Sequence, residues 1–246
     1  MFDVVIRNGL VIDGTGAPGQ IADVALNDGR IAAVGEVSES GAREIDAKGL
    51  VVAPGFVDIH THFDAQVFWD TTLSPSPLHG VTTVISGNCG FTIAPLEPEH
   101  GDYMMQMLAR VEGMPLTSLQ QGVPWNWRTF GEYLDAIDGS LMPNAGFLVG
   151  HSALRRTVMG ERSVGEFASE DELKAMKELL AESIEAGGLG FSSSWAKTHN
   201  DADGDAVPSR HASQRELVEL CAVLKDSPAV ALEFIPTIER FDDELY

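Results

Sequence analysis

The most constraining feature of this chain is the stretch 51–64, VVAPGFVDIHTHFD, in which an apolar run ends in two histidines, His60 and His62. Side chains two positions apart in a strand point to the same side, so both imidazoles are expected on one face. Active sites of parallel α/β folds lie at the carboxyl ends of their strands. Two imidazoles there can hold one metal ion, most simply Zn²⁺, with Asp58 as a supporting or packing residue. The alternative is a pair of ordinary solvent-facing histidines.

The chain changes character near residue 51. Residues 2–50 form short β-branched runs with Asn8-Gly9 and Asp28-Gly29 as turn signals, which predicts a small antiparallel β unit. Five apolar runs then alternate with amphipathic stretches: LVVAPGFVDI, GVTTVIS, AGFLVG, GGLGFSS and AVALEFIP. Near-continuous apolar strands are typical of a parallel sheet. We expect a β unit over 1–52 and a catalytic α/β domain over 53–246.

The helices between these strands have recognisable starts. Capping boxes are predicted at Thr129 with Glu132, Ser169 with Glu172, and Ser213 with Glu216. Strand–helix alternation indicates an α/β fold with parallel strands. Five strands fit either an open sheet or a (β/α) barrel that is incomplete, since a closed eight-stranded barrel needs about 250 residues of its own.

A second candidate ligand is Cys89, just past the second apolar run in VTTVISGNCGF. Small neighbours allow a sharp turn there and are expected to keep the sulfur accessible. A thiolate beside a divalent cation is a strong zinc ligand. Most free cysteines are instead small buried hydrophobes, and Cys221, on the apolar face of a predicted helix, is assigned that role.

The remaining histidines carry weaker signals. His151 ends the third run and is a candidate substrate-binding or proton-carrying residue, with a hydrogen-bonded loop histidine as the equal alternative. Arg155, or Arg156, could recognise a substrate carboxylate. His199 and His211 bracket a polar loop that is expected to be a mobile lid or surface loop, because it lacks the helix and glutamate of an EF-hand.

Composition excludes several classes of protein. The net charge of −21 disfavours nucleic acid as a partner, and two cysteines make no disulfide framework. We see neither a signal peptide nor an apolar run of the roughly 20 residues that a membrane helix needs. The expected location is the cytoplasm, and no membrane partner is expected.

Five motifs together resemble the amidohydrolase superfamily, and within it the D-aminoacylase (N-acyl-D-amino-acid deacylase) group. They are DVVIRNGLVIDGTG, PGFVDIHTHFDAQVFWD, HGVTTVISGNCGFTIAP, VGHSALR and EAGGLGFSSS, and the resemblance covers essentially the whole chain. It implies a TIM-like barrel of the metal-dependent hydrolase type with a small β-sandwich part. It also implies that Cys89 is a metal ligand, where many relatives use a carboxylated lysine of the fourth strand.

The resemblance further implies that the chain is the N-terminal part of a longer, zinc-dependent enzyme with one or two ions. The general-base aspartate is then expected beyond residue 246, and the substrate is expected to be a small N-acyl amino acid with a linear amide. In the family a metal histidine ends the fifth strand; this chain has none there, and a role for Glu233 stays open. Alternatives are a cyclic amidohydrolase, similar to dihydroorotase or hydantoinase, and an inactive relic of the fold.

Overall fold

The computed structural model describes residues 1–227 and 229–238. The chain divides into two compact units, Met1–Phe56 and Val57–Tyr246, where the sequence predicted a boundary after residue 52.

The first unit is one mixed β-sheet. Its order is β3-β2-β1-β4, with β5 also on β1. The strands are β1 (Phe2–Val11), β2 (Gln20–Asn27), β3 (Arg30–Gly35), β4 (Gly41–Asp46) and β5 (Val51–Val52). β1 is antiparallel to β2 but parallel to β4 and β5, so the prediction of a purely antiparallel unit was wrong.

The two predicted turns of this unit have different outcomes. Asp28 and Gly29 both have positive φ angles and join β2 to β3, as expected. Asn8 lies inside β1 instead, with a φ of 60° and a register shift between Ile6 and Gly9. Asparagine tolerates the left-handed region, so the same dipeptide that can make a hairpin makes a β-bulge here.

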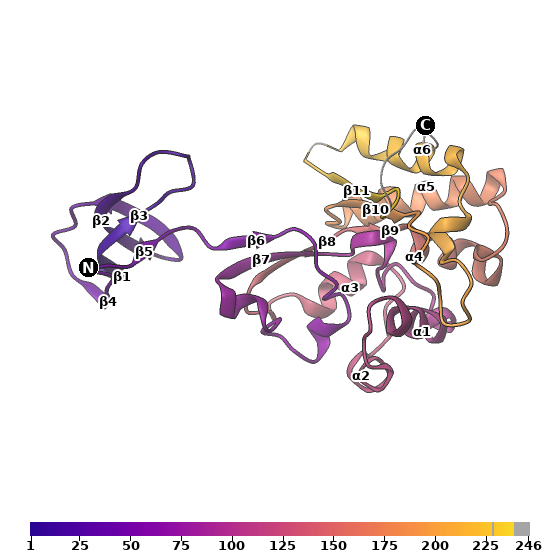
Figure 1. Ribbon diagram of the computed structural model, residues 1–246, viewed down its shortest axis with the longest axis horizontal. Coiled ribbons are helices and arrows are strands. Elements are labelled where there is room, and N and C mark those ends of the chain that lie inside the picture. The colour runs from indigo at the N-terminus through magenta and orange to yellow at the C-terminus, as the bar shows by residue number, and fades with distance from the viewer. Residues whose placement is uncertain (228, 239–246) are drawn as a thin grey trace. The chain divides into compact units, whose positions relative to one another are not determined.

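All five predicted runs contain strands: the first run, which crosses the boundary between the units, is divided into β5 and β6, and the third into β8 and β9. The strands β6 to β11 belong to the sheets of the second unit. They form two three-stranded sheets, β6-β7-β8 and β11-β10-β9, and the pairs β7/β8, β9/β10 and β10/β11 are parallel. The strands, visible in Figure 1, are β6 (Phe56–Asp58), β7 (Val81–Ser86), β8 (Asn144–Phe147), β9 (Val149–Gly150), β10 (Gly190–Ser194) and β11 (Ala231–Ile235).

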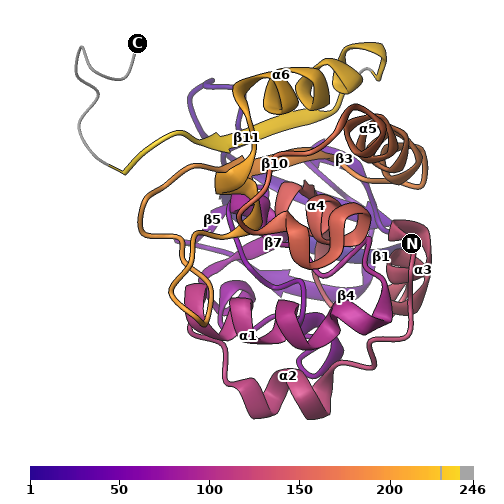
Figure 2. The ribbon, with the colours of Figure 1, turned by 90° about the vertical axis from the view of Figure 1, so that its right-hand side faces the viewer.

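Six α-helices connect these strands in the described part of the chain. They are α1 (Gly101–Val111), α2 (Leu116–Gly122), α3 (Phe130–Ile137), α4 (His151–Met159), α5 (Glu170–Glu185) and α6 (Gln214–Val223). Figure 2 shows α4, α5 and α6 beside the β9–β11 sheet. None of the described helices is both long and apolar enough to cross a membrane.

The capping boxes predicted for α3 and α5 are confirmed. At α6 only half of the box forms: the Ser213 hydroxyl accepts a hydrogen bond from the Glu216 backbone N–H. The Glu216 carboxylate does not return to the helix start, because it binds two buried partners described below.

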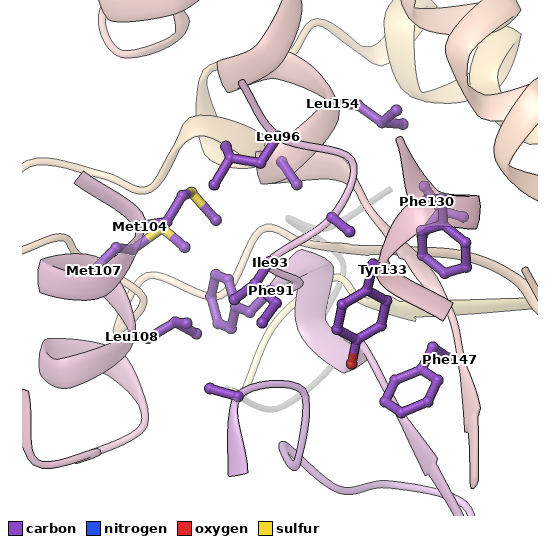
Figure 3. Packing of buried hydrophobic residues seen from close by; sticks show 14 of the residues in the cluster. Phe91, Ile93, Leu96, Met104, Met107, Leu108, Phe130, Tyr133, Phe147 and Leu154 are labelled. Atoms are coloured by element: carbon purple, nitrogen blue, oxygen red, sulfur yellow. The ribbon is translucent and has the colours of Figure 1, made fainter. Parts of the chain in front are cut away.

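The core of the second unit includes the segment that follows β7, which packs against α1 and α3. Figure 3 shows this packing, in which fully buried side chains come from that segment, α1 and α3: Phe91, Ile93, Met104, Met107, Leu108, Phe130 and Tyr133. The Tyr133 hydroxyl donates to the backbone oxygen of Asp64, at 3.0 Å. The core thus anchors the chain just after the two histidines, at Asp64, and just after Cys89, at Phe91. These anchors limit where the predicted ligands can lie.

Candidate metal centre

The three predicted ligands converge at the ends of the first two strands of the second unit. Cys89 Sγ lies 3.3 Å from His60 Nε2 and 3.7 Å from His62 Nε2. Both histidines follow β6 rather than belonging to it, so strand alternation is not what brings them together. The loop does so, with Asp58 accepting the His60 backbone N–H at 3.2 Å.

The spacing of these atoms fits a tetrahedral zinc ion. With Zn–N near 2.0–2.1 Å and Zn–S near 2.3 Å, tetrahedral angles separate a nitrogen and a sulfur ligand by about 3.6 Å. The two sulfur–nitrogen separations, 3.3 and 3.7 Å, bracket that value, and the three candidate ligand atoms all lie within 4.8 Å of one another. Two imidazoles and one thiol are also a donor set that zinc takes.

A left-handed turn aims the sulfur at the histidines. Gly87 has a φ of 80° and Cys89 a φ of 59°, an unusual value for a residue with a side chain. A Cβ on Gly87 would lie 2.3 Å from the Leu148 backbone oxygen, so glycine is required there. Cys89 is 4% exposed, which corrects the expectation of an accessible sulfur: the imidazoles and the core cover it.

Burial sets the protonation states of the candidate ligands, and a bound cation would change that of Cys89. It lowers the pKa of His62 to about 4, helped by neighbouring His60 and His199, so the imidazole is neutral and has a lone pair to donate. Burial, followed by the nearby carboxylates of Glu233 and Glu112, raises the pKa of the Cys89 thiol well above its usual range. A bound cation reverses that shift, because it stabilises the thiolate.

Two acidic residues that carried no predicted role lie beside the ligands. Glu112 follows α1, and its Oε2 is 3.5 Å from His62 Nε2. Burial raises the pKa of Glu112 to about 7, while that of His62 is lowered, so this contact is not a full ion pair. Asp64 is buried, which raises its pKa to about 7, and its Oδ1 has no hydrogen-bond partner among the described residues. Asp64 could have been found from the sequence, because it belongs to the histidine motif. No motif marks Glu112.

His199 also faces this cluster, although its loop was expected to be a mobile lid or surface segment. Its Nδ1 lies 2.8 Å from the Ser194 hydroxyl, and its ring lies 5.0 Å from that of Phe91, centroid to centroid. Through its charge it contributes to the lowered pKa of His62.

The loop itself is anchored by Asp201, which is 3% exposed. One carboxylate oxygen accepts the backbone N–H groups of Asp203 and Asp205, and the other accepts the Tyr103 hydroxyl at 3.1 Å. The alternating aspartates therefore form a hydrogen-bonded turn, which local sequence does not distinguish from a mobile loop.

The two predicted substrate-binding residues form a separate buried cluster. His151 and Arg155 are both 0% exposed and share Glu216 as a partner. The His151 Nε2 is 2.9 Å and the Arg155 Nη1 is 2.6 Å from that carboxylate, and His151 Nδ1 is 2.8 Å from the Ser193 hydroxyl. Their contacts join α4, α6 and β10; substrate binding by either residue stays a prediction.

The comparisons with known proteins agree with this geometry. A model of the amidohydrolase family matches residues 43–245, so the chain belongs to that family. It is 35% identical to the D-aminoacylase of Alcaligenes xylosoxydans xylosoxydans over 91% of this chain and 42% of that protein. It is 40% identical to an uncharacterised protein of Mycobacterium tuberculosis over 97% of this chain and 41% of that one.

A solved structure of the same group superposes well. The N-acyl-D-glutamate deacylase of Bordetella bronchiseptica, complexed with zinc and a phosphonate inhibitor, has a TM-score of 0.75 and 31% identity over 95% of this chain and 44% of that one. The predicted resemblance to the D-aminoacylase group is thereby confirmed. The chain spans about two fifths of the length of the curated relatives it matches.

Proposed function

We propose that this chain is the N-terminal part of a zinc-dependent hydrolase that removes the acyl group of a small N-acyl amino acid. The observation that carries the proposal is the convergence of His60, His62 and Cys89 at zinc-compatible distances. Membership of the amidohydrolase family and the likeness to the D-aminoacylase and the N-acyl-D-glutamate deacylase support it.

We further propose that the second unit is the first five strands of a (β/α) barrel. Its parallel strand pairs and intervening helices support this, as does the coverage of only about two fifths of each curated relative. The general-base aspartate is then supplied by sequence beyond Tyr246. The cytoplasmic location and the small-molecule partner stay predictions for the whole protein.

The residues of this chain have distinct tasks in that proposal. His60, His62 and Cys89 would hold one or two zinc ions, and the turn at Gly87 keeps the sulfur aimed at the imidazoles. When bound, zinc would polarise the acyl carbonyl and lower the pKa of a coordinated water towards ~7. Asp64 supports the turn by accepting the Gly87 backbone N–H at 3.1 Å.

Zinc content of the purified chain tests the metal site. We expect near-stoichiometric zinc by elemental analysis, lost in Cys89→Ala and retained in Cys221→Ala, whose sulfur lies on α6. If the wild type and both variants contain no zinc, the proposed site is contradicted.

Substrate comparison on the longer protein that carries this chain tests the reaction. We expect release of free amino acid from N-acetyl-D-amino acids and no ring opening of a hydantoin. Ring opening without deacylation would favour the cyclic-amide alternative, and neither activity in a zinc-loaded protein would favour a relic of the fold.

A further inference from the structure

Glu233 reaches the metal centre from a third strand. It lies in β11 opposite Ser192 of β10, and its Oε2 accepts the Cys89 backbone N–H at 2.7 Å. Ser192 holds the same turn, because its hydroxyl accepts the Gly90 N–H at 3.0 Å and donates to the Gly87 backbone oxygen. Two residues on neighbouring strands therefore hydrogen-bond to the turn that contains Cys89.

The Glu233 carboxylate interacts electrostatically with both His60 and Cys89. The other acidic neighbours of Cys89 are Glu112 and Asp64, and Glu112 contacts His62. No lysine or arginine in the described part of the chain forms an ion pair with Glu233. A half-buried carboxylate beside the Cys89 turn, with no ion-paired lysine or arginine among the described residues, is an environment suited to a metal cation.

We propose that Glu233 is the fourth protein ligand of the metal centre, beside His60, His62 and Cys89. The charges support this set: two neutral imidazoles, one thiolate and one carboxylate balance a divalent cation, and zinc takes carboxylate oxygens as well as nitrogen and sulfur. The Glu233 carboxylate does not belong to the group of ligand atoms that lie within 4.8 Å of one another, so ligation would require its side-chain torsions to rotate and bring one oxygen to the ion while the other keeps the Cys89 N–H. Metal-bound carboxylates are commonly hydrogen-bonded in this way.

The assignment of Glu233 rests on the zinc site proposed above. It adds the prediction that metal binding depends on the charge of Glu233. If Glu233 only positions Cys89, an uncharged acceptor of the same shape is enough. If Glu233 is a ligand, the loss of its charge changes both the affinity and the ligand field of the metal. Glu233→Gln separates these roles, because the amide oxygen can still accept the Cys89 N–H.

The test uses the metals alone on the 246-residue chain. Zn²⁺ affinity is measured by competition with a chromophoric chelator, and the absorption spectrum of the Co²⁺-substituted chain reports the ligand field. We expect Glu233→Gln to lower Zn²⁺ affinity by about 100-fold or more, beyond the 10–100-fold that partners of ligands usually contribute, and to alter the Co²⁺ spectrum. The exposed Glu178→Gln in α5 is the matched control and is expected to change neither.

The outcomes distinguish the two proposals. Wild-type affinity and spectrum in Glu233→Gln, with zinc still lost in Cys89→Ala, would overturn the role of Glu233 and leave the zinc site standing. Weaker binding with an unchanged Co²⁺ spectrum would also overturn it, since Glu233 would then act only through Cys89. If the wild type binds no zinc, both the zinc site and the role of Glu233 as a ligand are contradicted. Circular dichroism and thermal unfolding of each metal-free variant check that the fold is retained.

Discussion

The second unit contains two histidine clusters built from similar residues, and they differ in how well their polar atoms are paired. Around His151, both ring nitrogens have partners, Ser193 and Glu216, and both carboxylate oxygens of Glu216 accept hydrogen bonds. Around His62, the buried Nδ1 has no partner among the described residues, and the closest neighbours of Nε2 are a thiol and a carboxyl group.

We infer from this difference that the His151 cluster is structural and that the His62 cluster binds a cation. Unpaired buried polar atoms are costly, so a native structure that keeps them together usually uses them. In the His151 cluster both ring nitrogens and the Glu216 carboxylate are paired, although the buried Arg155 Nε has no hydrogen-bond partner among the described residues, and the cluster ties α4 to α6. The His60–His62–Cys89 cluster has donor atoms that a cation would satisfy.

The largest expected effect is the loss of the buried pair in the structural cluster. Arg155→Met leaves the Glu216 carboxylate, which is 2% exposed, without its permanent cationic partner. Removing one partner of a buried pair costs about 3–5 kcal/mol of unfolding free energy. Chemical denaturation measures it.

The control is Lys174→Met, in an exposed pair with Glu178, and it is expected to cost less than about 0.5 kcal/mol. Equal costs for the two variants would mean that the buried cluster is not the structural element described here.

Zinc bound at the His60–His62–Cys89 cluster should stabilise the folded chain. A ligand at 100 times its Kd adds about 2.7 kcal/mol to the free energy of unfolding. We expect excess Zn²⁺ to raise the melting temperature of the wild type, and a chelator to reverse it. Cys89→Ala should show no zinc-dependent shift, whereas an equal shift in that variant would place the zinc elsewhere.

The third prediction concerns pH. His151→Gln is expected to cost about 1–3 kcal/mol at pH 7, because Ser193 and Glu216 lose good geometry. Burial lowers the pKa of His151 in the folded state below its ordinary value of 6.5. The unfolded state therefore gains a proton first as pH falls through 6.5, and the wild type loses stability that the glutamine variant does not. The gap between the two should narrow from pH 7 to pH 5; a gap that widens would mean that His151 is charged in the fold.

The smallest effect is expected at the helix start that carries Glu216. Ser213→Ala removes the hydroxyl that accepts the Glu216 N–H at 3.1 Å and should cost about 1 kcal/mol. Thr129→Ala, at the complete capping box of α3, is the comparison. Because Glu216 uses its carboxylate elsewhere, the Ser213 variant should lose no more stability than the Thr129 variant.

The sequence by itself determined five strand runs, the starts of two capped helices and the three candidate ligands that converge. Apolar runs predicted where the five strands of the second unit lie, because buried parallel strands need continuous apolar sequence. The histidine motif and the glycine-flanked cysteine each follow such a run, and the carboxyl ends of neighbouring strands meet at one edge. Local capping signals located α3 and α5 for the same reason: their information lies within a few residues.

Only the tertiary structure decided which other groups join each cluster. Glu112, His199 and Glu233 come from the end of a helix, a loop and a distant strand, and no spacing in the chain connects them to His60 or Cys89. Glu216 matched a capping box, yet its carboxylate binds Arg155, because a buried guanidinium attracts it more strongly than an exposed backbone N–H. Local propensity is encoded in neighbouring residues, whereas pairing across a core depends on what packing brings within reach.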